Sequence, residues 1–252
     1  SPSCGRELIL VPSTSRTAAF NGRAVESISG VSRLTRPHFH IYNRTPLSVH
    51  YSSFDSERYA LTYDNRTVRE VASKVPYDFM FIFINERTYG GGGIYKTYAT
   101  VAVDNVFSDY IVAHEFGHHF AALSDEYYTS QIAYDVSSPV TVEPWELNVT
   151  ALLDPKNLKW KDLVTPGTPI PTPWDKEKFD TYSNAIQQKR QQLRDAKAPE
   201  EEMEKLLLGE RKEESQILSN MKYTGKVGAF EGAAYYYKGM YRSSADCIMF
   251  TR

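Results

Sequence analysis

His114-Glu115-Phe116-Gly117-His118 is the stretch of this sequence that decides its fold. On a helix, His114 and His118 lie on one face, about one turn apart along the axis. Two imidazoles held in this way can occupy adjacent corners of a zinc tetrahedron, while Glu115 borders the same face without ligating the metal. The pattern H-E-x-x-H is typical of a zinc-dependent peptidase, in which the glutamate moves a proton from a zinc-bound water.

The residues around the motif indicate a helix that is capped by Ser108 or Asp109 and continues through Leu123. The stripe that we expect to face the core is apolar: Val112, Phe116, Phe120 and Leu123. The motif alone arises by chance in on the order of one chain in a hundred. The other interpretation is a buried helix whose histidines are only hydrogen-bonded, but it leaves a buried glutamate without a reason, and burying an unpaired carboxylate is costly.

Composition argues against several classes of function. The chain has 252 residues, enough for one large domain or a domain with a lobe. A net charge of -2 gives no indication of nucleic acid or an anionic membrane as partner. No apolar run reaches the length of a membrane span, and the residues from Ser1 to Cys4 lack the pattern of a signal peptide. Cys4 and Cys247 either form a disulfide, which would suit an exported protein, or are two free thiols.

Apolar runs predict the strands before the motif. The run from Tyr77 to Asn85 is typical of a central strand covered on both faces, and Glu7 to Pro12 reads as a first buried strand. Tyr98 to Val103 is a strand that, if it lies at an edge, could pair with an extended substrate. We interpret the glycine run from Gly90 to Gly93 as a mobile loop, because a phosphate cradle would need a helix and a lysine after it. Leu47 to Tyr51 is a further strand candidate.

The segment from Asp175 to Met221 is highly charged, and Pro199 splits it into two helices. We expect a projecting α-hairpin, either plainly solvated or acting as a lid over substrate. The predicted inner faces are apolar: Phe179, Tyr182, Ile186 and Leu193 on the first helix, and Met203, Leu206, Leu207 and Ile217 on the second. A second metal site at His38, His40 and His50 is not favoured, because no carboxylate pattern accompanies these histidines.

A catalytic zinc needs three protein ligands and an open position for water. No third histidine closely follows the helix, so Asp125 and Glu126 are the nearest candidates, with Asp135 a more distant one. In a straight helix Asp125 would lie about 10 Å beyond His118 along the axis, so the chain must bend back after about Leu123. We select Asp125, whose short side chain suits a backbone close to the metal, and expect Glu126 to point away to a cation or to backbone donors.

Three stretches resemble the IgA-peptidase family of zinc metallopeptidases, known chiefly from gut bacteria: the motif followed by Asp125-Glu126-Tyr127, the segment from Tyr89 to Ile94, and the segment from Tyr241 to Met249. The resemblance spans about Phe39 to Met249. It implies an α/β (α+β) fold, namely a metzincin-like domain with a twisted mixed sheet and the motif on the active-site helix. The charge pattern adds an inserted charged α-hairpin at about 175–221.

The resemblance also implies a methionine turn beneath the metal, with Met249 as its methionine; a core methionine is the other interpretation. The metzincin pattern H-E-x-x-H-x-x-G-x-x-H is not met, because Ala121 replaces its glycine and Ser124 stands at its third histidine. We expect a single catalytic domain over 1–252, with an upper lobe of 1–128 and a lower lobe of 129–252.

The function that follows is a secreted zinc-dependent endopeptidase, with His114, His118 and Asp125 as zinc ligands and Glu115 as the catalytic base. The resemblance implies an exported bacterial protein, secreted or in the cell envelope, that acts on proteins or peptides, host glycoproteins among them. The name of the family does not imply that this chain cleaves immunoglobulin A. The alternatives are a zinc exopeptidase and a non-catalytic module that binds a glycan or protein on a peptidase scaffold.

Overall fold

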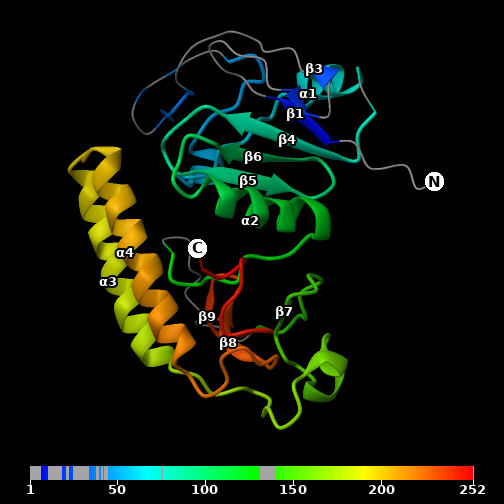
Figure 1. The fold of residues 1–252 in the computed structure, drawn as a ribbon. Coiled ribbons are helices and arrows are strands. Elements are labelled where there is room, and N and C mark those ends of the chain that lie inside the picture. The colour runs from blue at the N-terminus through cyan, green and yellow to red at the C-terminus, as the bar shows by residue number, and fades with distance from the viewer. Residues whose placement is uncertain are drawn as a thin grey trace. The chain divides into compact units, whose positions relative to one another are not determined.

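The computed structural model describes residues 34–37, 40, 42, 45–74, 76–130 and 140–251, together with the backbone of three short strands before residue 34. The chain folds as two compact units, Ser1–Ala121 and Ala122–Arg252 (Figure 1). Among the residues described, no helix has both the length and the apolar character that crossing a membrane requires.

The first unit is built on a four-stranded mixed sheet with the strand order β1-β4-β6-β5. Its strands are β1 (Glu7–Leu10), β4 (Phe79–Ile84), β5 (Gly91–Ile94) and β6 (Tyr98–Ala102). β1, β4 and β6 run parallel to one another, while β5 runs antiparallel to β6. The helix α2 (Ser108–Ala121) packs along this sheet beside β5 and β6 (Figure 1). The smaller elements of this unit are β2 (Ala19–Phe20), β3 (Arg23–Ala24), η2 (Ser53–Asp55) and α1 (Asn65–Ala72).

Three of the predicted strands are confirmed, among them Tyr98–Ala102 as β6, and one is wrong. β4 lies between two parallel partners, with Met80, Ile82 and Ile84 buried on one face and Phe81 on the other, as expected of a strand covered on both faces. β1 confirms the first strand at Glu7–Leu10. The stretch from Leu47 to Tyr51 forms no strand, because its backbone pairing is confined to isolated bridges at His50.

The second unit combines a small antiparallel sheet with a helical hairpin. The sheet has the order β7-β9-β8, made of β7 (Val149–Thr150), β8 (Phe230–Ala233) and β9 (Tyr236–Arg242). The hairpin consists of α3 (Lys176–Asp195) and α4 (Glu200–Ser219), and Pro199 stands at the N-cap of α4, which confirms the predicted split. Two short turns of 3₁₀-helix, η3 (Pro155–Asn157) and η4 (Lys161–Leu163), precede the hairpin.

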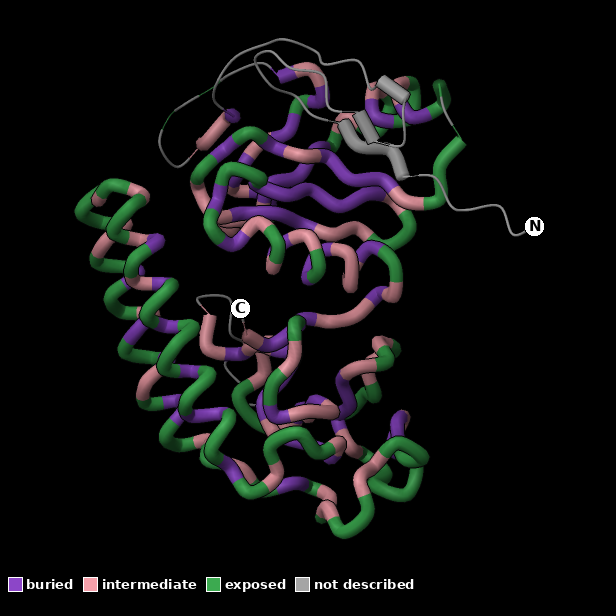
Figure 2. The backbone as a smooth tube through the Cα atoms, in the orientation of Figure 1, coloured by how far each residue is buried: buried purple, intermediate pink, exposed green. Residues whose placement is uncertain are grey.

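The buried positions of the hairpin are more charged than predicted. Four of the expected apolar residues are buried: Phe179, Ile186, Leu207 and Ile217. Phe179 and Ile217 belong to a core cluster that also includes residues outside the hairpin. Five charged residues are buried along the same helices: Asp180, Arg190, Glu204, Glu210 and Glu214. Figure 2 shows buried positions recurring along both helices between exposed ones. Apolar periodicity therefore located the inner faces, but it could not reveal which charged side chains would share them.

Candidate metal centre

α2 carries the H-E-x-x-H motif and begins at Ser108, so the predicted caps Ser108 and Asp109 are its first two helical residues. The side-chain oxygen of Asn105 accepts from the N–H of Phe107 at 2.9 Å, and the Asn105 carbonyl accepts from the N–H of Ser108 at 3.0 Å. Asn105 therefore fixes the backbone just before the helix begins. Short polar side chains commonly have this role at the N-terminus of a helix.

α2 ends at Ala121, earlier than the predicted Leu123. The cause is Ala122, whose φ of 53° is in the left-handed region that commonly ends helices. Glycine is the usual residue at such a position, so an alanine gave no signal in the sequence. The helix thus stops before Asp125, as a third ligand at this position requires.

The face of α2 that is buried differs from the predicted one. Ile111, Glu115 and His119, spaced four residues apart, are buried on the side of the sheet. Phe120 is 55% exposed, and its ring stacks on the half-buried Phe116 at a centroid distance of 5.2 Å. The expected core stripe of Val112, Phe116, Phe120 and Leu123 is therefore wrong.

Glycines in β5 explain why polar residues of α2 can face the sheet. A Cβ added to Gly93 would lie 2.5 Å from the carbonyl oxygen of Glu115 and 2.7 Å from the Cβ of His118. A Cβ on Gly91 would lie 3.1 Å from Oε1 of Glu115. The backbone of α2 thus packs directly on the backbone of β5, at the turn of helix that carries the motif.

The other two glycines of the run face the opposite layer. A Cβ on Gly90 would lie 2.5 Å from a ring carbon of Tyr51, and a Cβ on Gly92 would lie 2.5 Å from a methyl carbon of Leu61. The glycine run is therefore pressed between two layers, with three of its residues in β5. The predicted mobile loop is wrong, because here the missing side chains permit close packing on both faces.

The edge of the sheet is β5, and β6 is an interior strand bonded to both β4 and β5. The expectation that an extended substrate could pair with Tyr98–Ala102 as an edge is therefore wrong. The outer side of β5 is itself covered at Gly91, whose carbonyl accepts from Ala60 N–H and whose N–H donates to the carbonyl of Arg58, both at 3.2 Å.

We expect Gly93→Ala to destabilise the first unit by about 3 kcal/mol, because the new methyl group meets helix backbone that cannot rotate away. The matched control is Gly209→Ala in α4, where nothing lies within 4 Å of the added Cβ. There the better helix propensity of alanine should stabilise by about 1 kcal/mol. Urea unfolding midpoints of both variants check this, and shifts in the same direction would contradict the close packing of α2 on β5.

His119, next to the motif, connects α2 to the sheet. Its Nε2 accepts from the N–H of Met80 at 3.3 Å, which leaves the proton on Nδ1 to donate to the carbonyl of Ile94 at 3.1 Å. Burial lowers the pKa of His119, and the hydrogen bond to Ile94 opposes this shift. His119 is thus a neutral structural histidine.

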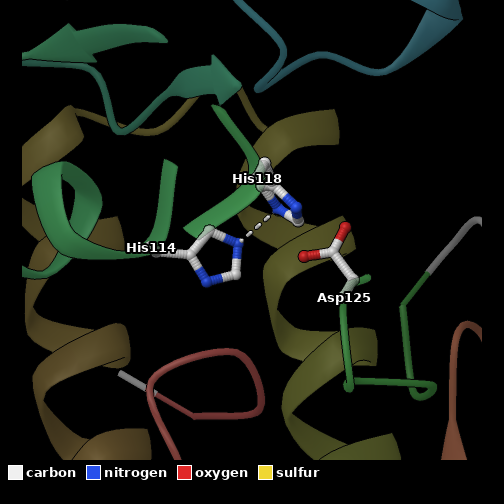
Figure 3. A group of neighbouring side chains, drawn as sticks. All are labelled: His114, His118 and Asp125. Carbon is white, nitrogen blue, oxygen red and sulfur yellow. Dashed lines mark hydrogen bonds between the residues drawn. The ribbon is translucent and has the colours of Figure 1, made fainter. Parts of the chain in front are cut away.

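His114, His118 and Asp125 form the one group of three potential metal ligands found among the described residues. One ligand atom from each lies within 4.8 Å of the others, and the three side chains point toward one another (Figure 3). The Nε2 atoms of the two histidines are 3.2 Å apart. Tetrahedral zinc with bonds of about 2.05 Å holds two nitrogen ligands about 3.3 Å apart, so the imidazole pair fits this ion.

Tyr110 supports His114 from one helical turn earlier. Its hydroxyl lies 3.1 Å from Nδ1 of His114. When Nε2 of His114 binds a metal, Nδ1 carries the proton and donates it to this hydroxyl, an arrangement that fixes the ring of a ligating histidine. The sequence analysis missed Tyr110, although its spacing of four residues from His114 was a readable signal.

The backbone on both sides of Asp125 is held by several contacts within the second unit. The Asn148 amide donates to the carbonyl of Ser124 at 2.8 Å and its oxygen accepts from the N–H of Ser124 at 2.9 Å. The Asp125 carbonyl accepts from Ala234 N–H at 3.0 Å. Asp125 is 5% exposed and thus sits on a well-fixed segment rather than on a free loop.

Glu126 points into the interior of the second unit. It is 2% exposed, and its carboxylate accepts from the thiol of Cys247 at 2.9 Å and from the amide of Asn148 at 3.1 Å. Burial raises the pKa of Glu126, while these two bonds and the charge of Arg242 lower it. Of the two predicted kinds of partner, the cation is present as the charge of Arg242, while the hydrogen-bond donors are side chains and not backbone groups.

Cys247 is a free thiol, and burial is the main cause that raises its pKa. Cys4 lies outside the described residues, as do His38 and Asp135. Met249 is 2% exposed, and its carbonyl accepts from the N–H of Glu126 at 2.8 Å. The segment predicted to be a methionine turn therefore bonds to the residue that follows Asp125.

The chain is similar to a known family of proteins. The family model described as IgA Peptidase M64 matches residues 8–252. No curated protein matches the chain. M64 proteins are metallopeptidases, and two histidines and an aspartate brought together are a donor set that such an enzyme can use. Because the match covers nearly the whole chain, the protein belongs to the IgA peptidase M64 family.

Proposed function

We propose that this protein is a zinc-dependent endopeptidase in which His114, His118 and Asp125 hold the metal. The observation that carries the proposal is the separation of 3.2 Å between the two Nε2 atoms, together with a carboxylate within 4.8 Å. Two imidazoles and one carboxylate are an established donor set for catalytic zinc, and three protein ligands leave a position for water.

Zinc bound by these residues supplies Lewis acidity and makes a water molecule a stronger acid. Glu115 is the group that accepts the proton from the attacking water and passes it to the leaving amine. It is 8% exposed and rests against β5 at Gly91, so its carboxylate has a fixed position one residue after His114. On the outer side of β5, the backbone of Gly91 is already bonded to Arg58 and Ala60. An extended peptide could therefore pair with β5 only at the residues after Gly91.

Three finer features belong to the same proposal. The catalytic domain is metzincin-like, and Met249 is the methionine of the turn beneath the metal; its burial and its bond to Glu126 support this role. The protein is exported from a bacterium, secreted or held in the cell envelope. Its substrates are proteins or peptides, with host glycoproteins among them. Family membership supports the peptidase activity itself.

Metal analysis and a peptide-library digest test the proposal together. After reconstitution with zinc, the purified protein should hold one zinc per chain and cut library peptides at internal bonds. Cuts confined to peptide ends would indicate an exopeptidase instead. Zinc binding without any cleavage would favour the binding module on a peptidase scaffold. Absence of zinc after reconstitution would overturn the metal assignment.

A further inference from the structure

The turn between β8 and β9 contacts the segment that carries Asp125. Ala234 and Tyr235 form this turn. The N–H of Ala234 donates to the carbonyl of Asp125 at 3.0 Å, and the N–H of Tyr235 donates to the carbonyl of Tyr127 at 3.1 Å. The hydroxyl of Tyr235 donates to Oδ2 of Asp125. Backbone and side chain of the turn thus both bond to residues 125–127.

Both residues of the turn have positive φ, 52° at Ala234 and 66° at Tyr235. Two-residue hairpin turns with two such residues favour glycine, asparagine and aspartate, because other side chains crowd the backbone there. Tyrosine is therefore a poor choice for the turn itself. Unfavourable backbone conformations often mark functional positions, and the contact between the Tyr235 hydroxyl and Asp125 supplies a reason for this one.

A second tyrosine extends this contact. The hydroxyls of Tyr127 and Tyr235 are 3.1 Å apart, and their rings meet edge to face at a centroid distance of 5.2 Å. An ionised carboxylate only accepts hydrogen bonds, so Tyr235 donates to Asp125 and can accept from Tyr127. Hydrogen bonds in such a chain polarise one another, which strengthens the bond that reaches Asp125.

We propose that Tyr235 is a positioning residue for the metal site: it holds Oδ2 of Asp125 so that the other carboxylate oxygen is presented to the metal, and Tyr127 holds Tyr235 in turn. This rests on the proposed function, since it takes Asp125 as a zinc ligand. Hydrogen bonds to a ligating carboxylate fix its orientation before the metal arrives, and such supporting residues typically contribute about 10–100-fold to metal affinity.

Zinc affinity of the full chain, measured by competition with a chromogenic chelator, tests the proposal. Tyr235→Phe should bind zinc about 10–100-fold more weakly than the wild type. Tyr235→Asn should show a comparable loss, although asparagine suits the backbone of the turn better than tyrosine. Tyr127→Phe, which leaves the bond to Asp125 in place, should lose less. At saturating zinc, the KM of Tyr235→Phe for a peptide should equal that of the wild type.

Thermal unfolding of the metal-free variants separates positioning from a structural role. If Tyr235→Phe lowers the unfolding temperature but keeps the wild-type zinc affinity, Tyr235 serves only the turn and the proposal is wrong. Asp125→Asn distinguishes this failure from failure of the proposed function. A wild type that binds no zinc overturns both proposals, whereas zinc binding that Asp125→Asn loses and Tyr235→Phe keeps overturns only the role of Tyr235.

Discussion

Replacing Glu115 by glutamine is expected to slow peptide hydrolysis by about 10²–10⁴-fold, because the side chain can no longer accept a proton. The zinc content should not change, since glutamine leaves His114, His118 and Asp125 intact. Glutamine has nearly the size of glutamate, so the close contact with Gly91 on β5 is preserved. The substitution therefore creates no cavity at this side chain, which is 8% exposed. The measurements are zinc per chain and kcat/KM on one peptide.

Glu70→Gln is the matched control, because it makes the same substitution at an exposed position of α1 in the same unit. This variant should hydrolyse the peptide at the wild-type rate. If zinc-loaded Glu115→Gln hydrolysed the peptide at the wild-type rate, Glu115 would not be the catalytic base, even if the metal site were assigned correctly. Loss of zinc in that variant would instead show that Glu115 supports the ligands.

Much of the fold could be read from local patterns. The apolar run that became β4 and the proline that separates α3 from α4 each act within a few residues, so their signals are contained in the sequence nearby. The spacing of His114 and His118 likewise follows from the geometry of a single helix. Such features need no knowledge of which distant segments meet.

The wrong predictions arose where one local pattern has two physical meanings. A glycine run can be mobile, or it can let two layers approach, and only the neighbours of Gly91 and Gly93 decide between these. We predicted the buried face of α2 from its apolar residues, which assumes that the side chains of the helix pack on side chains of the sheet. A glycine strand instead accepts the helix backbone, which brings Glu115 and His119 to the inner face.

The contacts that fix Asp125 come from distant parts of the chain. Asn148 follows it by more than twenty residues and Tyr235 by more than a hundred, and neither spacing carries a periodic signal. Tyr235 even occupies a backbone conformation that argues against tyrosine. Supporting residues of this kind are decided by tertiary contacts, so the grouping of His114, His118 and Asp125 could be predicted while most of the contacts that hold Asp125 could not.

Asp125→Asn is expected to weaken zinc binding by more than the roughly 100-fold upper limit typical of residues that only support a ligand. The variant removes the negative charge from the proposed ligand while retaining its size and the contact of Tyr235 with its side chain. An amide oxygen is a weaker donor to zinc than a carboxylate, so the two imidazoles alone cannot hold the ion at the wild-type affinity.

Glu126→Gln is the neighbouring and equally isosteric control. Glu126 is directed at Cys247 and Asn148, and the group of potential ligands contains Asp125 but not Glu126. Glutamine can still accept a hydrogen bond there, so this variant should bind zinc with the wild-type affinity while losing some stability to urea. Chelator competition on both variants decides the assignment: if Glu126→Gln loses zinc while Asp125→Asn retains it, the third ligand is Glu126, and the carboxylate must leave its thiol partner to reach the metal.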